Sequence, residues 1–149
     1  MTTSSEKHGP ARVVRAEVTE APISVTELAD AVHDAAAGAV VTFEGVVRNH
    51  DADRGVSGIG YSCHPTAGQI VKEIARDVAE RRRVRALGVV HRVGDLAVGE
   101  AALAVAVSSD HRAEAFATCG EIVEEVKKRL PVWKRQTFSD GTSQWSNLA

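Results

Sequence analysis

The sequence is poor in aromatic residues and in net charge, and each shortage argues against a class of protein. Aromatic residues make up 4% of the 149 residues, which leaves few rings on which RNA bases could stack. The formal net charge is −2, whereas nucleic-acid-binding domains are usually strongly basic. No apolar run reaches the roughly 18 residues that a membrane-spanning helix needs. We therefore expect neither a general nucleic-acid binder nor a membrane-spanning protein.

Cysteine is also scarce, and the usual metal-binding and phosphate-binding motifs are missing. Cys63 and Cys119 lie far apart and form no Cys-x-x-Cys pair. The sequence contains no G-x-x-x-x-G-K-[ST] and no H-E-x-x-H. Cys63 is followed by His64, but neighbouring residues on a strand point to opposite faces. We expect reduced, structural cysteines, no bound metal and a cytoplasmic location.

The length and composition fit one globular domain. Hydrophobic residues make up 44% and charged residues 26% of the chain, both within the range of soluble domains. The opening sequence MTTSSEKHGP has no apolar segment of the kind found in secretory signals. We expect a flexible tail over residues 1–10 and a single domain over residues 11–149.

The hydrophobic pattern predicts about three helices and a larger number of strands. The helices are expected over residues 24–37, 66–83 and 110–130. The strands are expected over residues 12–19, 39–48, 59–62, 84–93, 100–109 and 132–138, with a short one around Trp145. Ser24 and Thr66 each precede a Glu or Gln by three residues, which is the spacing of a helix capping box, and residues 49–58 are predicted to form a mobile loop. Helices and strands do not alternate strictly, so an α+β domain with a mostly antiparallel or mixed sheet is predicted.

Positive charge is concentrated in the segment KKRLPVWKR, residues 127–135, where five of nine residues are cationic. Pro131 and Trp133 within it predict an ordered turn between a helix and a strand. We expect an anion site at this corner.

The helical pattern separates the two lysines at the start of this segment. The predicted buried stripe of the preceding helix consists of Phe116, Cys119, Val123, Val126 and Leu130. At about 100° per residue, Lys128 points away from the stripe, whereas Lys127 lies at its edge. A partly buried lysine beside other cations suits acid–base or nucleophilic work. Lys127 is thus the better catalytic candidate, although a purely structural lysine remains an alternative.

Further cations are expected at the ends of other elements. Arg48 ends a strand beside the glycine-bearing loop, and His111 and Arg112 start the longest helix, where free N–H groups can hold a phosphate. Asp110 is the predicted N-cap, and His111 and Arg112 could equally belong to a solvated helix start. The run Arg81–Arg83 is either a nucleic-acid patch or an ordinary complement to the helix dipole.

The distance along the longest helix implies an assembly. His111 and Lys127 are sixteen residues apart, which is about 24 Å at 1.5 Å per residue. One small substrate cannot easily touch both residues of one chain. If both act in one site, we expect a two-fold dimer with sites built across the interface.

Four segments together carry a resemblance to a known family. VTFEGVVRNH (41–50), HRVGDLAVGE (91–100), SSDHRAEAF (108–116) and KKRLPVWKR (127–135) resemble the large, catalytic subunit of molybdopterin synthase in order and spacing. The likeness extends from about residue 12 to Trp145. It implies a single domain of the α/β hammerhead type.

The resemblance also implies an activity and its partners. Members of this family are sulfurtransferases of molybdenum cofactor biosynthesis that convert cyclic pyranopterin monophosphate to molybdopterin. The sulfur comes from a thiocarboxylate on the C-terminal Gly-Gly of a small ubiquitin-like subunit, and no cofactor is permanently bound. Two large subunits form a homodimer within a heterotetramer.

The resemblance assigns site residues by position. Lys127 and Lys134 match the catalytic lysines of the family, with Lys127 acting as an acid–base group or through a transient covalent link. The substrate-binding positions implied are Val46, Val47, Arg48, His111, Arg112, Arg135 and Gln136, with His111 and Arg112 supplied by the opposite subunit.

The sequence departs from the family pattern in two places, around residues 62–67 and at the C-terminal end. Ser62 stands where a carboxylate is usual, Ala67 stands where a methionine is usual, and the chain stops soon after Trp145. Neither Lys127 nor Lys134 is affected, so we expect activity to survive. The alternative is a non-catalytic module of the same fold that binds anions or a ubiquitin-like tail.

Overall fold

The computed structural model describes residues 9–148 of the chain. Most of the tail expected over residues 1–10 lies outside the described residues. The elements in chain order are β1 (Arg12–Thr19), α1 (Val25–Ala31), β2 (Ala39–Val46), β3 (His50–Asp51), β4 (Arg54–Cys63), α2 (Ala67–Arg81), β5 (Ala86–Arg92), β6 (Gly94–Ala97), β7 (Ala101–Ser109), α3 (Arg112–Arg129), β8 (Val132–Phe138) and β9 (Ser143–Asn147).

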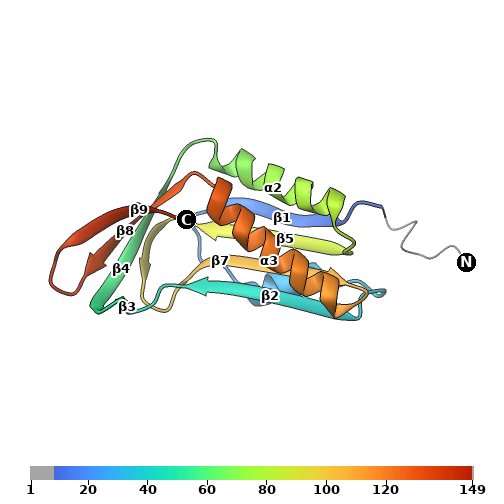
Figure 1. Cartoon of the computed structure of the whole chain (residues 1–149), viewed down its shortest axis with the longest axis horizontal. Helices are drawn as coiled ribbons and strands as arrows, with labels where there is room; N and C mark the ends of the chain where they lie inside the picture. The colour runs from blue at the N-terminus through green and yellow to red at the C-terminus, as the bar shows by residue number, and fades with distance from the viewer. Residues whose placement is uncertain (1–8, 149) are drawn as a thin grey trace, which may run out of the picture.

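A four-stranded sheet in the order β1-β5-β7-β2 forms the centre of the molecule (Figure 1). The β1–β5 pair is parallel, whereas β5–β7 and β2–β7 are antiparallel. Eight of the nine residues of β7 are buried, as its nearly continuous apolar sequence predicts for a strand covered on both faces. The predicted α+β class with a mixed sheet is confirmed.

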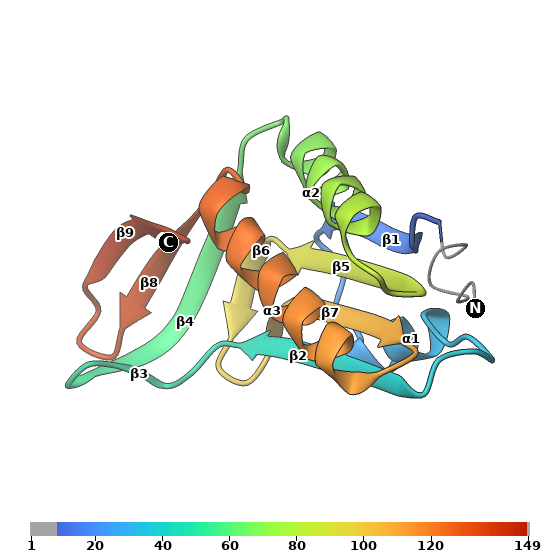
Figure 2. The same ribbon diagram turned by 45° about the vertical axis from the view of Figure 1, so that its right-hand side comes forward.

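Helices cover both faces of this sheet. Helices α2 and α3 lie side by side on one face, and the short helix α1 packs on the other (Figures 1 and 2). The larger core lies beneath α2 and α3 and includes Ile74, Val105 and Ile122, all fully buried. On the other face α1 approaches β5 so closely that a Cβ on Gly88 would lie 2.6 Å from Cδ1 of Leu28.

A second sheet extends from one end of the first. Its strand order is β3-β4-β8-β9, and β6 pairs with the edge of β4 opposite to β8 (Figure 2). Strand β8 leaves α3 through Pro131, which ends the helix as predicted. The chain therefore turns sharply where α3 meets the second sheet.

The structure corrects the prediction of a mobile loop over residues 49–58. Strands β3 and β4 form a tight hairpin there, and Ala52 in its turn has φ of 53°. The short strand expected over residues 59–62 is the end of the ten-residue β4. Strand β6 was also not predicted, because its sequence GDLA lacks the β-branched residues that mark a strand.

Some predicted helix ends are confirmed and others are wrong. The Ser24 cap is confirmed, since the Glu27 backbone N–H donates to Ser24 Oγ at 3.1 Å, but α1 ends at Ala31 and not beside Gly38. Thr66 makes no side-chain capping bond to α2. Its hydroxyl lies 2.9 Å from Nδ1 of His64 instead, so the second predicted capping box is wrong.

Four of the five residues predicted for the buried stripe of α3 are buried, namely Cys119, Val123, Val126 and Leu130, and Phe116 is the exception. Phe116 is 62% exposed, and small residues such as Ala115 and Thr118 take its place against the sheet. Glu121 on α3 accepts hydrogen bonds at 2.6 and 2.7 Å from Arg81, the last residue of α2, and from Arg82, which follows it. Two members of the arginine run at residues 81–83 thus connect the two helices. None of the described helices is long and apolar enough to span a membrane.

Candidate active site

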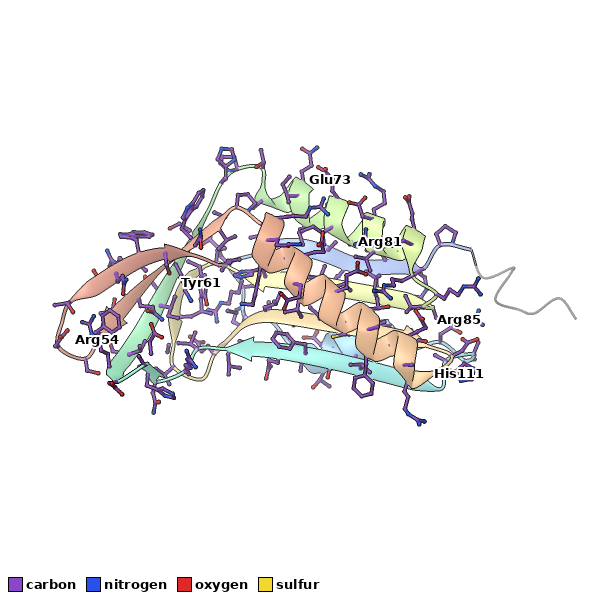
Figure 3. All side chains as sticks on the ribbon, in the orientation of Figure 1. Arg54, Tyr61, Glu73, Arg81, Arg85 and His111 are labelled. Carbon is purple, nitrogen blue, oxygen red and sulfur yellow. The ribbon has the colours of Figure 1, made fainter. Side chains whose placement is uncertain are left out.

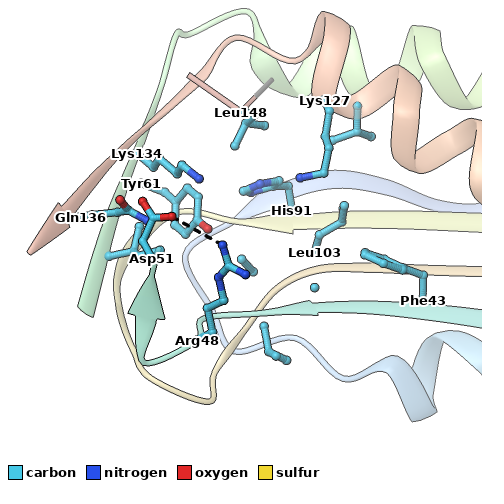
Figure 4. A pocket seen from close by; sticks show the side chains of 15 residues that line it. Phe43, Arg48, Asp51, Tyr61, His91, Leu103, Lys127, Lys134, Gln136 and Leu148 are labelled. Carbon is cyan, nitrogen blue, oxygen red and sulfur yellow. Dashed lines mark ion pairs between the residues drawn. The ribbon is translucent and has the colours of Figure 1, made fainter. Parts of the chain in front are cut away.

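A cavity of about 240 Å³ opens where the C-terminal end of α3 meets the second sheet. Three cationic side chains line it: Arg48, which follows β2, Lys127 of α3, and Lys134 of β8 (Figure 4). They come from separate parts of the chain, and the fold brings them together. A cavity lined by converging cations attracts an anionic ligand.

The end of β2 delivers Arg48 to the cavity through a local irregularity. The register of β2 against β7 shifts between Gly45 and Val46. A Cβ on Gly45 would lie only 3.2 Å from Cε2 of Phe43, which explains the glycine at this bend. Gly45 thus combines a register shift with a close approach inside its own strand.

Arg48 is held only loosely by its own chain. Its Nη2 lies 3.6 Å from Oδ1 of Asp51, and the two side chains are 66% and 42% exposed. Exposed ion pairs of this kind contribute little stability. Arg48 can therefore exchange Asp51 for an anionic ligand at small cost.

Lys127 and Lys128 differ in direction, as the helical pattern predicts. Lys127 lines the cavity and Lys128 does not. Both side chains are nevertheless exposed in the single chain. The expected partial burial of Lys127 is therefore wrong for one subunit, because the true apolar stripe of α3 lies further from it.

Strand β8 presents alternate residues to its two faces. Lys134 and Gln136 line the cavity, and Lys134 pairs across the strands with Tyr61 of β4. Arg135 points to the other face, where its guanidinium lies 5.9 Å from the ring of Trp145. Arg135 is thus outside this cavity, as the period-two pattern of a strand requires.

The two valines assigned to the site, Val46 and Val47, lie in different surroundings. Val46 lines the cavity and is 50% exposed. Val47 is buried in a small core with Val56 and Phe138. Val47 therefore supports the cavity wall from behind.

His111 and Arg112 lie at the far end of α3 from the cavity, and both are exposed (Figure 3). His111 occupies the N-cap position without a side-chain capping bond, so the prediction of Asp110 as the cap is wrong. The Asp110 carboxylate instead accepts hydrogen bonds from Arg85 at 2.6 and 2.9 Å. One chain does not bring His111 or Arg112 to the lysines.

Two polar residues of the cavity were not assigned a role from the sequence. Tyr61 and His91 both line it, and their rings meet edge to face with centroids 5.2 Å apart. Burial raises the pKa of Tyr61, so its hydroxyl stays protonated and can donate a hydrogen bond. His91 belongs to the quoted segment HRVGDLAVGE, but its direction depends on tertiary packing that the pattern does not contain.

The described residues contain no group of three His, Cys, Asp or Glu side chains arranged to hold a metal ion. The polar groups of the cavity are mainly cations and hydrogen-bond donors. Such a set can bind phosphate or carboxylate-like groups and stabilise negative charge that develops on an oxygen or sulfur atom.

Comparisons with known proteins place the chain in a family. The MoaE protein family model matches residues 18–129. The molybdopterin synthase catalytic subunit of Aspergillus clavatus is 36% identical over 91% of this chain and 69% of its own length. The corresponding subunit of Nostoc sp. is 35% identical over 88% of this chain and 81% of its own.

The solved structures agree with this relationship. Molybdopterin synthase from Staphylococcus aureus superposes with a TM-score of 0.82 at 28% identity, covering 89% of this chain and 96% of that one. A MoaE protein from Burkholderia ambifaria superposes with a TM-score of 0.74 at 25% identity, covering 93% and 90%. The chain belongs to the MoaE family of molybdopterin synthase catalytic subunits and has an enzymatic role in molybdenum cofactor biosynthesis.

Proposed function

We propose that this chain transfers sulfur from a thiocarboxylated small partner subunit to cyclic pyranopterin monophosphate, forming the dithiolene of molybdopterin. The observation that carries the proposal is the convergence of Arg48, Lys127 and Lys134 on one cavity. The substrate phosphate and the thiocarboxylate are both anions. Two anions brought together repel each other, and fixed cations reduce that repulsion.

The three cations would have different roles, which follow from their positions around the cavity. Arg48 lies at the mouth with a weak partner, which suits a guanidinium that grips phosphate. Lys127 and Lys134 approach the cavity from α3 and β8, so a reacting group between them would be flanked by two amines. Lys127 acts on the reacting centre, and Lys134 stabilises the negative charge.

The partner would be a small ubiquitin-like subunit with a C-terminal Gly-Gly. A likeness that shows the fold alone, with a TM-score of 0.62 at 19% identity, is to a complex of subunits 1 and 2 of a molybdopterin-converting factor from Helicobacter pylori. A chain ending in two glycines is narrow and can enter a cavity that side chains would block. The reducing cytoplasm is the proposed location, since both thiols, Cys63 and Cys119, are free.

We further propose that two copies form a dimer and that the assembly with two small subunits is a heterotetramer. His111 and Arg112 can join Lys127 only if another chain supplies them, because they lie at opposite ends of α3. Phe116 on α3 is 62% exposed, and Val40 and Val46 on the edge strand β2 are 39% and 50% exposed. Apolar side chains on neighbouring elements suit an interface with a second copy.

The test is a reconstituted assay with matched lysine variants. The protein, a thiocarboxylated small subunit and cyclic pyranopterin monophosphate are mixed, and molybdopterin is measured as its fluorescent oxidised derivative. We expect product from the wild type and a loss of about 10²–10⁴-fold in Lys127→Ala, the range for removal of an acid–base group. Lys128→Ala, one residue away but outside the cavity, should stay close to wild type.

Two other outcomes would overturn parts of the proposal. Binding of the small subunit without product would favour a non-catalytic binding module. Equal behaviour of Lys127→Ala and Lys128→Ala would show that the cavity is not the reaction site. A monomer with full activity in light scattering and in the assay would refute the dimer.

A further inference from the structure

His91 is the buried histidine of this cavity, and neither the sequence pattern nor the proposed chemistry gives it a role. It lies near the end of β5 and is 3% exposed. The other histidines that the structure describes are exposed. A buried polar ring beside a group of cations requires a physical explanation.

The hydrogen bonding of the ring fixes its tautomer. Nδ1 of His91 lies 2.7 Å from the carbonyl oxygen of Arg92. A carbonyl oxygen can only accept, so Nδ1 carries the proton and donates it. Nε2 is then the nitrogen with a free lone pair while the ring is neutral.

The ring stays neutral over the physiological pH range. Burial lowers the pKa of His91 from 6.5 to about 4, against the opposing effect of the hydrogen bond to Arg92, and the charge of Lys127 lowers it further. The charged and titratable groups that line the cavity around the ring are Arg48, Asp51, Tyr61, Lys127 and Lys134. A neutral acceptor can sit among these cations without adding to their repulsion.

The ring is also held in a fixed direction. Tyr61 packs against it edge to face at an interplanar angle of 75°. Figure 4 shows the Lys127 amine directed toward the His91 ring. Thus Nδ1 is held by the backbone carbonyl of Arg92, and the Lys127 amine points toward the same ring.

We propose that Nε2 of His91 accepts a hydrogen bond from the Nζ ammonium of Lys127 and so aims this amine at the reacting group. His91 is then a positioning residue that acts through Lys127. A flexible lysine side chain has many rotamers, and a fixed acceptor selects among them. The effect on turnover rests on the proposed function, whereas the contact itself does not.

The contact can be tested without substrate or partner. Long-range ¹⁵N–¹H spectra of the ¹⁵N-labelled protein report the protonation of each histidine nitrogen, and His91→Gln identifies the His91 signals. We expect an Nδ1–H tautomer and an Nε2 signal that shifts in Lys127→Met but not in Lys128→Met. A protonated Nε2, or an Nε2 signal indifferent to Lys127→Met, would refute the contact.

The consequence for catalysis is tested with two replacements of different chemistry. In His91→Gln the amide oxygen can take the place of Nε2 as acceptor, whereas His91→Phe keeps a ring against Tyr61 and removes the acceptor. We expect His91→Phe to lower kcat about tenfold or more with little change in KM, since misplacement by ~1 Å can cost about a hundredfold. His91→Gln should recover most of that loss.

A double-variant cycle separates positioning from a structural role. If His91 acts through Lys127, adding His91→Phe to Lys127→Ala should produce no further loss of kcat. Equal losses in both backgrounds, or equal kcat in the Gln and Phe variants, would overturn the positioning role. Thermal unfolding of each variant shows whether it is folded, and His91→Gln keeps the test informative should His91→Phe be unstable. If the wild-type protein forms no molybdopterin, the proposed function is refuted. The NMR experiment would still show whether His91 and Lys127 are in contact.

Discussion

The two ends of helix α3 carry the same kind of residue but sit in different surroundings. At its C-terminal end Lys127 lines a cavity that other strands complete. At its N-terminal end His111 and Arg112 are exposed, although the backbone there is anchored by the Asp110–Arg85 pair. The first end is a walled site within one chain. The second is a fixed cationic surface, and it becomes part of a site only when another surface covers it.

The largest effect is expected from a mixture of two inactive variants, which tests whether the N-terminal end of α3 completes the cavity of a second chain. Lys127→Ala and Arg112→Ala should each lose activity alone, because each removes a cation from every site. Co-expressed in equal amounts, they should recover about a quarter of wild-type activity, since about half of the dimers are mixed and each mixed dimer holds one intact site of two. The measurement is the molybdopterin assay on the mixed preparation.

The matched control pairs two residues of the same cavity. In a mixed dimer of Lys127→Ala with Arg48→Ala, each site lacks one cavity cation of its own chain, so no recovery is expected. Recovery in this control, or none in the first mixture, would show that the N-terminal end of α3 does not complete the partner's cavity.

The second test measures how the stability of the cavity end depends on pH. The pKa of His91 falls to about 4 in the folded state, mainly because of burial, so the unfolded chain binds more protons below its own pKa near 6.5. The stability from the neutral ring is thus fully present above about pH 6.5 and is lost as the pH falls toward 4. The shift corresponds to a loss of about 3 kcal/mol of unfolding free energy.

Urea unfolding of the wild type and of His91→Gln at pH 7 and pH 4 measures this loss. The variant should lose less stability than the wild type between the two values, and His64→Gln, at an exposed position, should behave as the wild type does. An identical acid loss in His91→Gln would mean that the interior at the cavity end holds no such titrating group.

The third test concerns the anchor at the other end. Arg85→Ala removes two hydrogen bonds to Asp110 and should lower the melting temperature by roughly 1–3 °C, since the pair is partly exposed. Calorimetry on Arg83→Ala, an exposed neighbour, provides the control. No change in Arg85→Ala would show that the start of α3 is fixed by other contacts.

The sequence predicts those features of the two ends of α3 that depend on residues close together in the chain. Pro131 and the pattern after it correctly predicted the end of α3 and the whole of β8. Phe116 was misplaced because a helical spacing alone does not say which apolar residues face the sheet. The close packing of α3 instead depends on small residues such as Ala115.

The candidate site was predicted where charge marks the sequence and missed where packing defines it. Arg48, Lys127 and Lys134 stand at the ends of recognisable elements, and the structure brings them to one cavity. His91 and Tyr61 gain their properties from burial and mutual contact, which arise only when β4 and β5 come together. No pattern within either strand specifies that contact.

The smallest expected effect tests the middle of α3, which joins the two ends. Burial raises the pKa of the Cys119 thiol to about 11, so roughly a thousandth of it is thiolate at pH 8, whereas Cys63 is exposed. Iodoacetamide on the native protein should label Cys63 first, as read by mass spectrometry, and Cys63→Ser should remove nearly all labelling until denaturant is added. Rapid labelling of Cys119 would show that α3 opens from the sheet in its middle. The two ends could then move independently, and a fixed distance of about 24 Å between His111 and Lys127 could no longer support the requirement for a second chain.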